Sequence, residues 1–139
     1  MDKRRLIIIA FFLVLIFTSC GQTESIDPET IGNVEQGRIL FEDPSRGRCT
    51  SCHTQDGSDV PTGPSLVGIA NIAGKRIPGL SAVEYLEQSI LDPSAYIVDG
   101  YQDRMKAYRI VVPDEVDYMF ADMLTEEDLN NLVAYLLTQ

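Results

Sequence analysis

The run Cys-x-x-Cys-His at residues 49–53 constrains this chain more than any other feature of its sequence. It places two thiols and an imidazole, all strong metal or cofactor ligands, on one short segment. A structural zinc site needs four ligands, usually supplied as two such pairs. The whole chain has three cysteines and one histidine, so it cannot supply a second pair.

Three other interpretations of this run differ in whether they explain the histidine at its end. A thioredoxin-like dithiol belongs in a βαβ context and does not need the histidine, and no alternating strands and helices follow the run. A disulfide across two residues would be strained and would leave His53 unexplained. The spacing is that of covalent haem attachment, in which Cys49 and Cys52 each add to a haem vinyl group and His53 becomes an axial ligand of the iron.

The third cysteine, Cys20, stands at the end of a predicted export signal. Residues 1–5 include three basic side chains, residues 6–17 are an unbroken apolar run, and small residues then lead into Cys20. Twelve apolar residues fall short of the roughly 20 that a helix needs to cross a bilayer. We therefore expect residues 1–19 to be a signal peptide, residues 20–32 a lipidated N-terminus and flexible linker, and residues 33–139 one domain.

The motif that predicts lipidation is Phe-Thr-Ser-Cys at residues 17–20, which resembles a bacterial lipobox. Its cysteine would be acylated and become the first residue of the mature chain. Phe17 departs from the usual leucine, and the alternative is a free cysteine at the end of an uncleaved signal anchor. Either way we expect the domain to be exported, in the periplasm or at the outer face of the cytoplasmic membrane.

The exported part of the chain is strongly acidic. Without residues 1–19 it keeps 8 Lys+Arg against 20 Asp+Glu, a net charge near −12. This charge argues against nucleic acid as a partner. It favours encounter with redox proteins or membrane complexes that present basic docking surfaces. The alternative is that the acidity only keeps an exported protein soluble.

The hydrophobic pattern predicts an all-α fold. Residues 33–41 favour a short helix despite Gly37, which costs about 1 kcal/mol in a helix interior and so indicates close packing there. Residues 62–79 are rich in Gly and Pro and predict a loop with at most one short helix. No sustained alternation typical of strands is present.

Two helices carry clear start signals. Ser81 and Glu84 form the pattern of a capping box, and the helix that follows should end near Asp92, because Pro93 disfavours helical geometry in the residue before it. Thr125 precedes three acidic residues that suit the first turn of a helix. The apolar residues of that C-terminal helix recur at helical spacing, at Leu129, Leu132, Val133 and Leu136.

In their order, these elements resemble a class I cytochrome c with one haem, over about residues 33–138. The family has a glycine and an aromatic residue in its first helix, here Gly37 and Phe41, ahead of the haem motif. The further motifs that carry the resemblance are Gly-Pro-x-Leu at 63–66, Gly-Tyr and then Met at 100–105, and Val-Ala-Tyr-Leu at 133–136.

The resemblance implies a fold in which the N- and C-terminal helices cross around one covalently bound haem c. Gly37 would allow close approach near Tyr135. The carbonyl of Pro64 would accept the Nδ1–H of His53, fixing the ring and raising its basicity as a ligand of the haem iron.

The sixth iron ligand has three methionine candidates. No second histidine exists, and a thioether is the usual alternative. Met105 stands at the family's place, although Lys106 follows it where the family usually has proline. Met119 and Met123 belong to a longer segment, residues 107–123, in which they could instead be core residues. A lysine ligand or an open position are the remaining alternatives.

The predicted function is that of an electron carrier rather than an enzyme, because the chain shows no nucleophile–base pair for hydrolysis or group transfer. The resemblance implies transfer of single electrons between respiratory or photosynthetic partners. One alternative is a fixed haem subunit of a larger membrane oxidoreductase complex. Another is a five-coordinate haem that binds gas or peroxide, but the bundle-type version places its motif near the C-terminus, and here 86 residues follow His53.

Overall fold

The computed structural model describes residues 26–115 and 122–139, so Cys20 and Met119 lie outside the described part. The fold is all-α, as the sequence predicts. The helices are α2 (Val34–Glu42), α3 (Ile69–Arg76), α4 (Ala82–Leu91) and α5 (Glu126–Leu136). Single 3-10 turns lie at η1 (Pro28–Thr30), η2 (Cys49–Ser51), η3 (Pro93–Ala95) and η4 (Pro113–Glu115).

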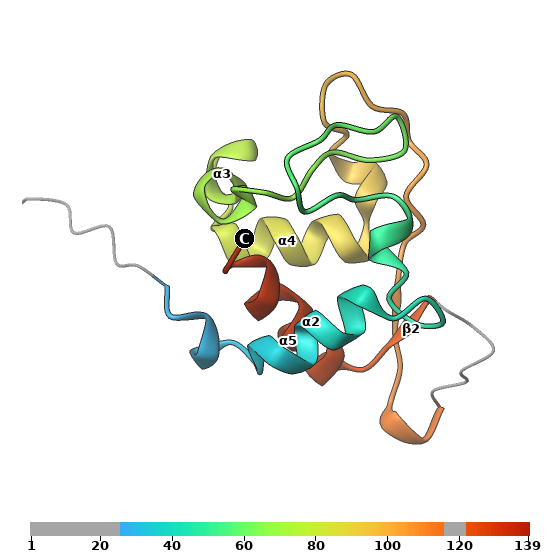
Figure 1. Cartoon of the computed structure of the whole chain (residues 1–139). Coiled ribbons are helices and arrows are strands. Elements are labelled where there is room, and N and C mark those ends of the chain that lie inside the picture. Colours follow the sequence, from blue (N-terminus) through green and yellow to red (C-terminus); the bar gives the residue numbers. More distant parts are fainter. Residues whose placement is uncertain (1–25, 116–121) are drawn as a thin grey trace, which may run out of the picture.

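The N-terminal helix α2 crosses the C-terminal helix α5, and this crossing is the base of the domain (Figure 1). A Cβ atom added to Gly37 would lie 1.9 Å from the carbonyl oxygen of Asn131 and 2.8 Å from Cβ of Tyr135. The rings of Phe41 and Tyr135 pack with their centroids 5.4 Å apart. The expected close approach at Gly37 is therefore confirmed.

The capping box predicted at Ser81 is present, and the helix start predicted at Thr125 is a second capping box. The Ser81 hydroxyl accepts the backbone N–H of Glu84, whose carboxylate accepts the N–H of Ser81, and α4 ends at Leu91 with Asp92 as its C-cap. Thr125 and Asp128 make the same reciprocal pair at the start of α5. Each box satisfies backbone donors that a helix N-terminus leaves without partners.

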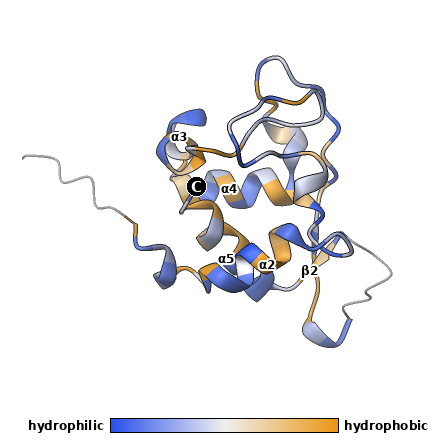
Figure 2. Cartoon of the chain, viewed as in Figure 1, coloured by the Kyte–Doolittle hydropathy of each residue, from blue (hydrophilic) through white to orange (hydrophobic). Residues whose placement is uncertain are grey.

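The core lies where the apolar faces of the helices meet, as the hydropathy colouring shows (Figure 2). α4 packs against α3 and α5, so one core joins the crossing to the upper half of the domain. The largest fully buried side chains are Phe41, Leu124 and Val133. Other buried members are Leu40, Ile69, Tyr85, Leu86, Ile90, Leu129, Leu132, Tyr135 and Leu136.

The predicted linker over residues 20–32 is too long at its C-terminal end. Asp27 caps the η1 turn by accepting the N–H of Glu29, and η1 lies against α5. Ile31 packs on the core, and a Cβ added to Gly32 would lie 2.6 Å from the backbone of Asn130. The sequence did not indicate this contact, because residues 21–30 are mostly polar and only the partly buried Ile31 packs on the core just after them.

Residues 109–110 and 123–124 form one short parallel strand pair that the sequence did not indicate. β1 (Arg109–Ile110) pairs with β2 (Met123–Leu124), and Ile110 is opposite Leu124. Two-residue strands are too short to show alternation, so no periodicity could reveal them. The pair places Leu124 in the core and leaves Met123 half-buried.

Candidate functional site

A cavity of about 770 Å³ lies between the upper loops and the helices. Its volume falls within the roughly 300–1,000 Å³ of typical cofactor sites. Apolar side chains from four of the helices form much of its lining, and the loops around residues 48–53, 62–66 and 93–106 complete it. The apolar lining residues include Phe41, Leu66, Ile69, Leu86, Ile90, Leu132 and Leu136.

One wall of this cavity carries the Cys-x-x-Cys-His run. Cys49 begins the η2 turn, and the backbone N–H groups of Cys52 and His53 both donate to the carbonyl of Cys49, at 3.1 and 2.9 Å. Both thiols are free and half-buried. Burial raises the pKa of the Cys49 thiol to about 12, so this sulfur is held as the neutral thiol. The tight turn thus brings both thiols and the imidazole to the same cavity.

His53 is fixed by the contact that the resemblance implies. Its Nδ1 lies 2.8 Å from the carbonyl oxygen of Pro64, and because a carbonyl can only accept, Nδ1 donates its hydrogen. This leaves the lone pair on Nε2, the nitrogen that can bind a metal. Burial lowers the pKa of His53, with the Pro64 carbonyl acting in the opposite direction, so the ring is favoured in its neutral, ligating form.

The loop between His53 and Pro64 needs a glycine at residue 63. A Cβ added to Gly63 would lie 2.7 Å from the carbonyl oxygen of Cys52 and 2.9 Å from Cε1 of His53. Only glycine lets this backbone pass so close to the imidazole. The Gly-Pro segment is therefore part of the geometry that holds the ring.

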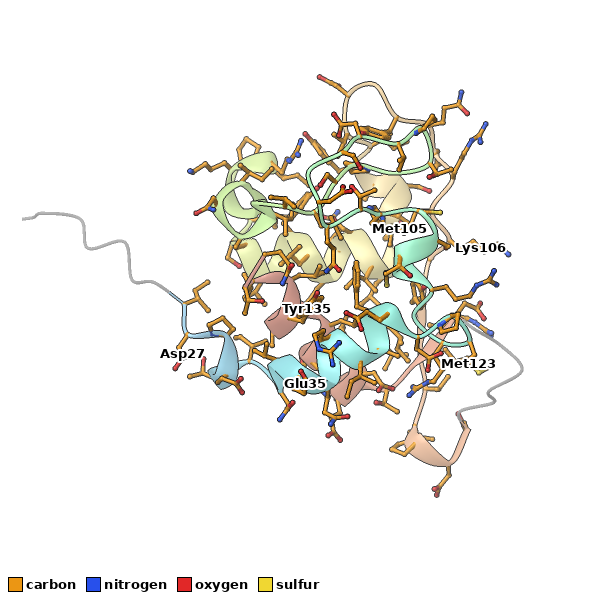
Figure 3. The ribbon with its side chains drawn as sticks, in the orientation of Figure 1. Asp27, Glu35, Met105, Lys106, Met123 and Tyr135 are labelled. Carbon is orange, nitrogen blue, oxygen red and sulfur yellow. The ribbon has the colours of Figure 1, made fainter. Side chains whose placement is uncertain are left out.

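Met105 lines the same cavity from the loop that follows η3, with 38 % of its surface exposed. Lys106 lines it too, and Figure 3 shows the two side by side. Met123 lies in β2, outside the set of cavity residues, and Figure 3 places it well below them. Met119 lies outside the described residues. Of the two methionines described among the candidates, only Met105 is brought to the site, and its role as iron ligand stays a prediction.

Two tyrosines tie the Met105 loop to the rest of the site: Tyr101, from the Gly-Tyr motif, and Tyr108, which no sequence motif indicated. The hydroxyl of Tyr101 donates to a carboxylate oxygen of Asp59 at 3.1 Å, which joins this loop to the segment after the haem motif. The hydroxyl of Tyr108 donates to the carbonyl of Gly47, just before Cys49. Both partners are far away in sequence, so no local pattern could have indicated them.

The donor set suits haem rather than a bare metal ion. One imidazole and one thioether are the axial ligands of a cytochrome c iron, and two thiols stand beside the imidazole. No group of three or more His, Cys, Asp or Glu side chains that could hold a metal ion occurs in residues 26–115 and 122–139. The residues present therefore fit an apolar, covalently attached macrocycle.

Comparison with known protein families shows where this chain belongs. The sequence profile of the family described as cytochrome c matches residues 34–139, well over half of the chain. No curated protein matches this sequence. Within the described residues, no helix is both long and apolar enough to cross a membrane.

Proposed function

The chain belongs to the cytochrome c family, and on that premise we propose that it is a membrane-tethered monohaem carrier of single electrons between respiratory or photosynthetic redox partners. The family binds covalently attached haem c, whose iron supplies the one-electron chemistry. The observation that supports the proposal most is the shared cavity. His53, held by Pro64, lines it together with both thiols, and Met105 lines it from another loop.

In this proposal each residue has one task. Cys49 and Cys52 hold the macrocycle through thioether bonds, so the haem cannot dissociate when an axial ligand is lost. His53 would bind the iron through Nε2, and the Pro64 carbonyl keeps its ring oriented and basic. Met105 would supply the second iron ligand of the chain, whose soft sulfur would favour ferrous iron and raise the reduction potential.

Attachment is tested by extraction of the purified protein with acidified acetone. We expect the haem to stay with the polypeptide, because the thioether bonds survive loss of the axial ligands. Cys49→Ala and Cys52→Ala should each sharply reduce the yield of holoprotein, whereas Ser51→Ala, in the same turn, should not. Haem that partitions fully into the organic phase would show that the attachment is wrong.

The tether rests on the sequence before the described residues. We propose that Cys20 is acylated and becomes the mature N-terminus, as the lipobox-like residues 17–20 indicate. Because η1 and Ile31 already contact the domain, the proposed linker would end by about residue 27. A flexible chain of that length has a root-mean-square reach of roughly 15 Å, so the haem would stay close to the bilayer. One acyl chain binds only marginally, and stable anchoring needs at least two.

Cys20→Ser tests the tether. The substitution should leave haem ligation intact and either block signal cleavage or release the protein from membranes. Intact-mass analysis of the wild type should show a chain that begins at Cys20 and carries lipid. A mature chain that begins at residue 21 or later, without lipid, would instead make this a diffusible carrier.

The acidic surface supports a partner with a basic docking face. The mature chain keeps 20 acidic against 8 basic residues, and at least three of the basic ones are engaged in ion pairs within the domain, Arg38, Arg46 and Arg109. Long-range attraction between opposite charges weakens with added salt. The rate of electron exchange with a basic redox protein should therefore fall as ionic strength rises. A rate that increases with salt would argue against this partner class.

A further inference from the structure

The longest stretch of the exported chain without an acidic residue is residues 60–83. It includes all of α3 and carries two cations, Lys75 and Arg76, so its net charge is +2. Arg76 lines the cavity, whereas Lys75 is exposed and does not. In a chain whose exported part has a net charge near −12, this stretch differs in sign from the whole.

The exposed side of α3 is otherwise uncharged. Between residues 66 and 80, the exposed residues other than glycine are Val67, Asn71, Ile72, Lys75 and Pro78, which we call the α3 face. Val67 is 54 % exposed and Ile72 is 39 % exposed. Exposed apolar side chains beside a cation suit the boundary between the headgroups and the acyl chains of an anionic membrane.

The acidic residue that follows this stretch is engaged at the start of the next helix. The carboxylate of Glu84 accepts the backbone N–H of Ser81 at 2.7 Å. At this position its negative charge is offset by the positive end of the α4 dipole. The charge that the α3 face presents is therefore that of Lys75.

The proposed linker reaches the domain on the side of α3. Gly32, just after η1, lies against Asn130 of α5, and the backbone N–H of Ala70 donates to the carbonyl of Gln139 at 3.3 Å. Nine residues separate Asn130 from Gln139, about 14 Å at the rise of a helix. Figure 1 shows α3 and the first described residues on the same side of the domain.

We propose that the α3 face rests on the anionic phospholipid headgroups of the membrane. The inference rests on the proposed tether and adds the orientation of the domain. Charges are screened over about 8 Å at physiological salt, and the linker reaches roughly 15 Å, so the tethered domain turns within the field of the headgroups. Surfaces rich in carboxylates are repelled there, whereas the α3 face is attracted.

A weak attraction is enough to orient a tethered domain. One lysine beside an anionic leaflet strengthens binding by about fivefold. A short linker adds an effective concentration in the millimolar range, so the face need not bind free vesicles tightly.

This orientation leaves the Met105 side of the cavity free of lipid. Figure 3 places Asp27, near the end of the linker, on one side of the domain and Met105 and Lys106 on the other. A redox partner therefore reaches the Met105 loop from the aqueous side.

Amine labelling tests the contact, because the chain after residue 19 has two lysines, Lys75 and Lys106. The lipidated holoprotein is placed in phosphatidylglycerol vesicles or in neutral detergent, and acetylation of each lysine is followed by mass spectrometry. We expect Lys75 to be labelled about fivefold more slowly on the vesicles than in detergent, and Lys106 to keep its rate. Phosphatidylcholine vesicles should protect Lys75 less, and equal protection by both lipids would overturn the role of charge.

Val67→Glu and Val112→Glu are the matched variants, because both valines are more than half exposed and neither lines the cavity. Val67→Glu puts a carboxylate on the α3 face and should return Lys75 to its rate in detergent, whereas Val112→Glu should keep the protection. Equal behaviour of the two variants would overturn the proposal, as would a wild-type Lys75 that reacts equally fast on vesicles and in detergent. Slow labelling of Lys75 in detergent as well, relieved only by dilution, would show that a second copy of the chain covers the face instead of lipid.

Flotation of the vesicles reports the tether separately. A chain that does not float is not anchored, and the proposed tether then fails on its own. The labelling of that chain is repeated at millimolar lipid, which replaces the effective concentration that the linker would supply. Protection of Lys75 under those conditions would support the α3 face as a lipid contact, and an unprotected Lys75 would overturn it.

Discussion

The crossing of α2 and α5 and the loops around the cavity are built in opposite ways. At the crossing, protein atoms pack directly against one another. Phe41 and Val133 are fully buried, and Gly37 allows the backbones of α2 and α5 to come into contact. Around the cavity, residues 99–107 are almost all exposed, and the segment is held by single contacts such as Tyr101 with Asp59. The first region is packed by side chains, whereas the second surrounds a volume that the cofactor fills.

This difference indicates where each kind of substitution should act. Close-packed interiors respond to changes of a single methyl group, so the crossing should control folding. The cavity loops bury little surface of their own, so substitutions there should change ligation and leave the fold in place.

The largest effect on stability is expected from Gly37→Ala. Helix propensity alone would favour alanine by about 1 kcal/mol. The added Cβ would lie 1.9 Å from the Asn131 carbonyl oxygen, so the helices must separate, and we expect a net loss of about 3 kcal/mol in the free energy of unfolding. Gly74→Ala in α3 is the control, because its nearest neighbour, the backbone nitrogen of Ala82, is 3.1 Å away. If denaturant unfolding shows the same change in the free energy of unfolding for both variants, the close approach at Gly37 is no more important for stability than the packing of Gly74.

At the cavity, the largest effect is expected from Met105→Ala. Loss of the thioether should abolish the iron–sulfur charge-transfer band of the oxidised protein and lower the reduction potential, with little change in helical content. Met123→Ala, outside the cavity, should leave both the band and the potential nearly unchanged. If the band survives in Met105→Ala and disappears in Met119→Ala, the ligand lies in the segment after residue 107.

A smaller effect is expected from Asn131→Ala, at the edge of the crossing. The side-chain oxygen of Asn131, a residue only 7 % exposed, accepts the backbone N–H of Asn33 at 2.7 Å. Its loss leaves that donor without its partner and should cost about 1–3 kcal/mol of stability. The exposed neighbour Asn130→Ala controls for the change in helix propensity. Coinciding unfolding curves for the two variants would show that the hydrogen bond between Asn131 and Asn33 does not stabilise the crossing.

The smallest effect is expected from Tyr101→Phe at the cavity rim. Removing the hydroxyl breaks the exposed contact with Asp59 and should speed the binding of added imidazole to the ferric iron, because the Met105 loop opens more easily. Thermal unfolding should change little. Tyr96→Phe is the matched control, since no hydrogen bond of its hydroxyl is found in the described part of the chain. A binding rate equal to that of the control would show that the contact does not hold the loop.

Much of the helical frame could be predicted because its signals are local. The Ser81 and Thr125 boxes, the stop before Pro93 and the apolar spacing of α5 each depend on residues within one or two turns. The haem motif is equally local, since its two cysteines and its histidine lie within five residues. The packing of Ile31, the β1–β2 pair and the Tyr101–Asp59 contact join residues far apart in the chain, and no short pattern encodes them.

The sequence by itself indicated the haem motif, the family and the positions of α2, α4 and α5, because backbone capping and covalent spacing are properties of neighbouring residues. Only the tertiary structure decided which of Met105 and Met123 reaches the cavity, and that Arg76 rather than Lys75 faces it. Those outcomes depend on how the loops and α3 are arranged around the cavity. Packing between segments far apart in the sequence fixes this arrangement, and short sequence patterns do not encode such contacts.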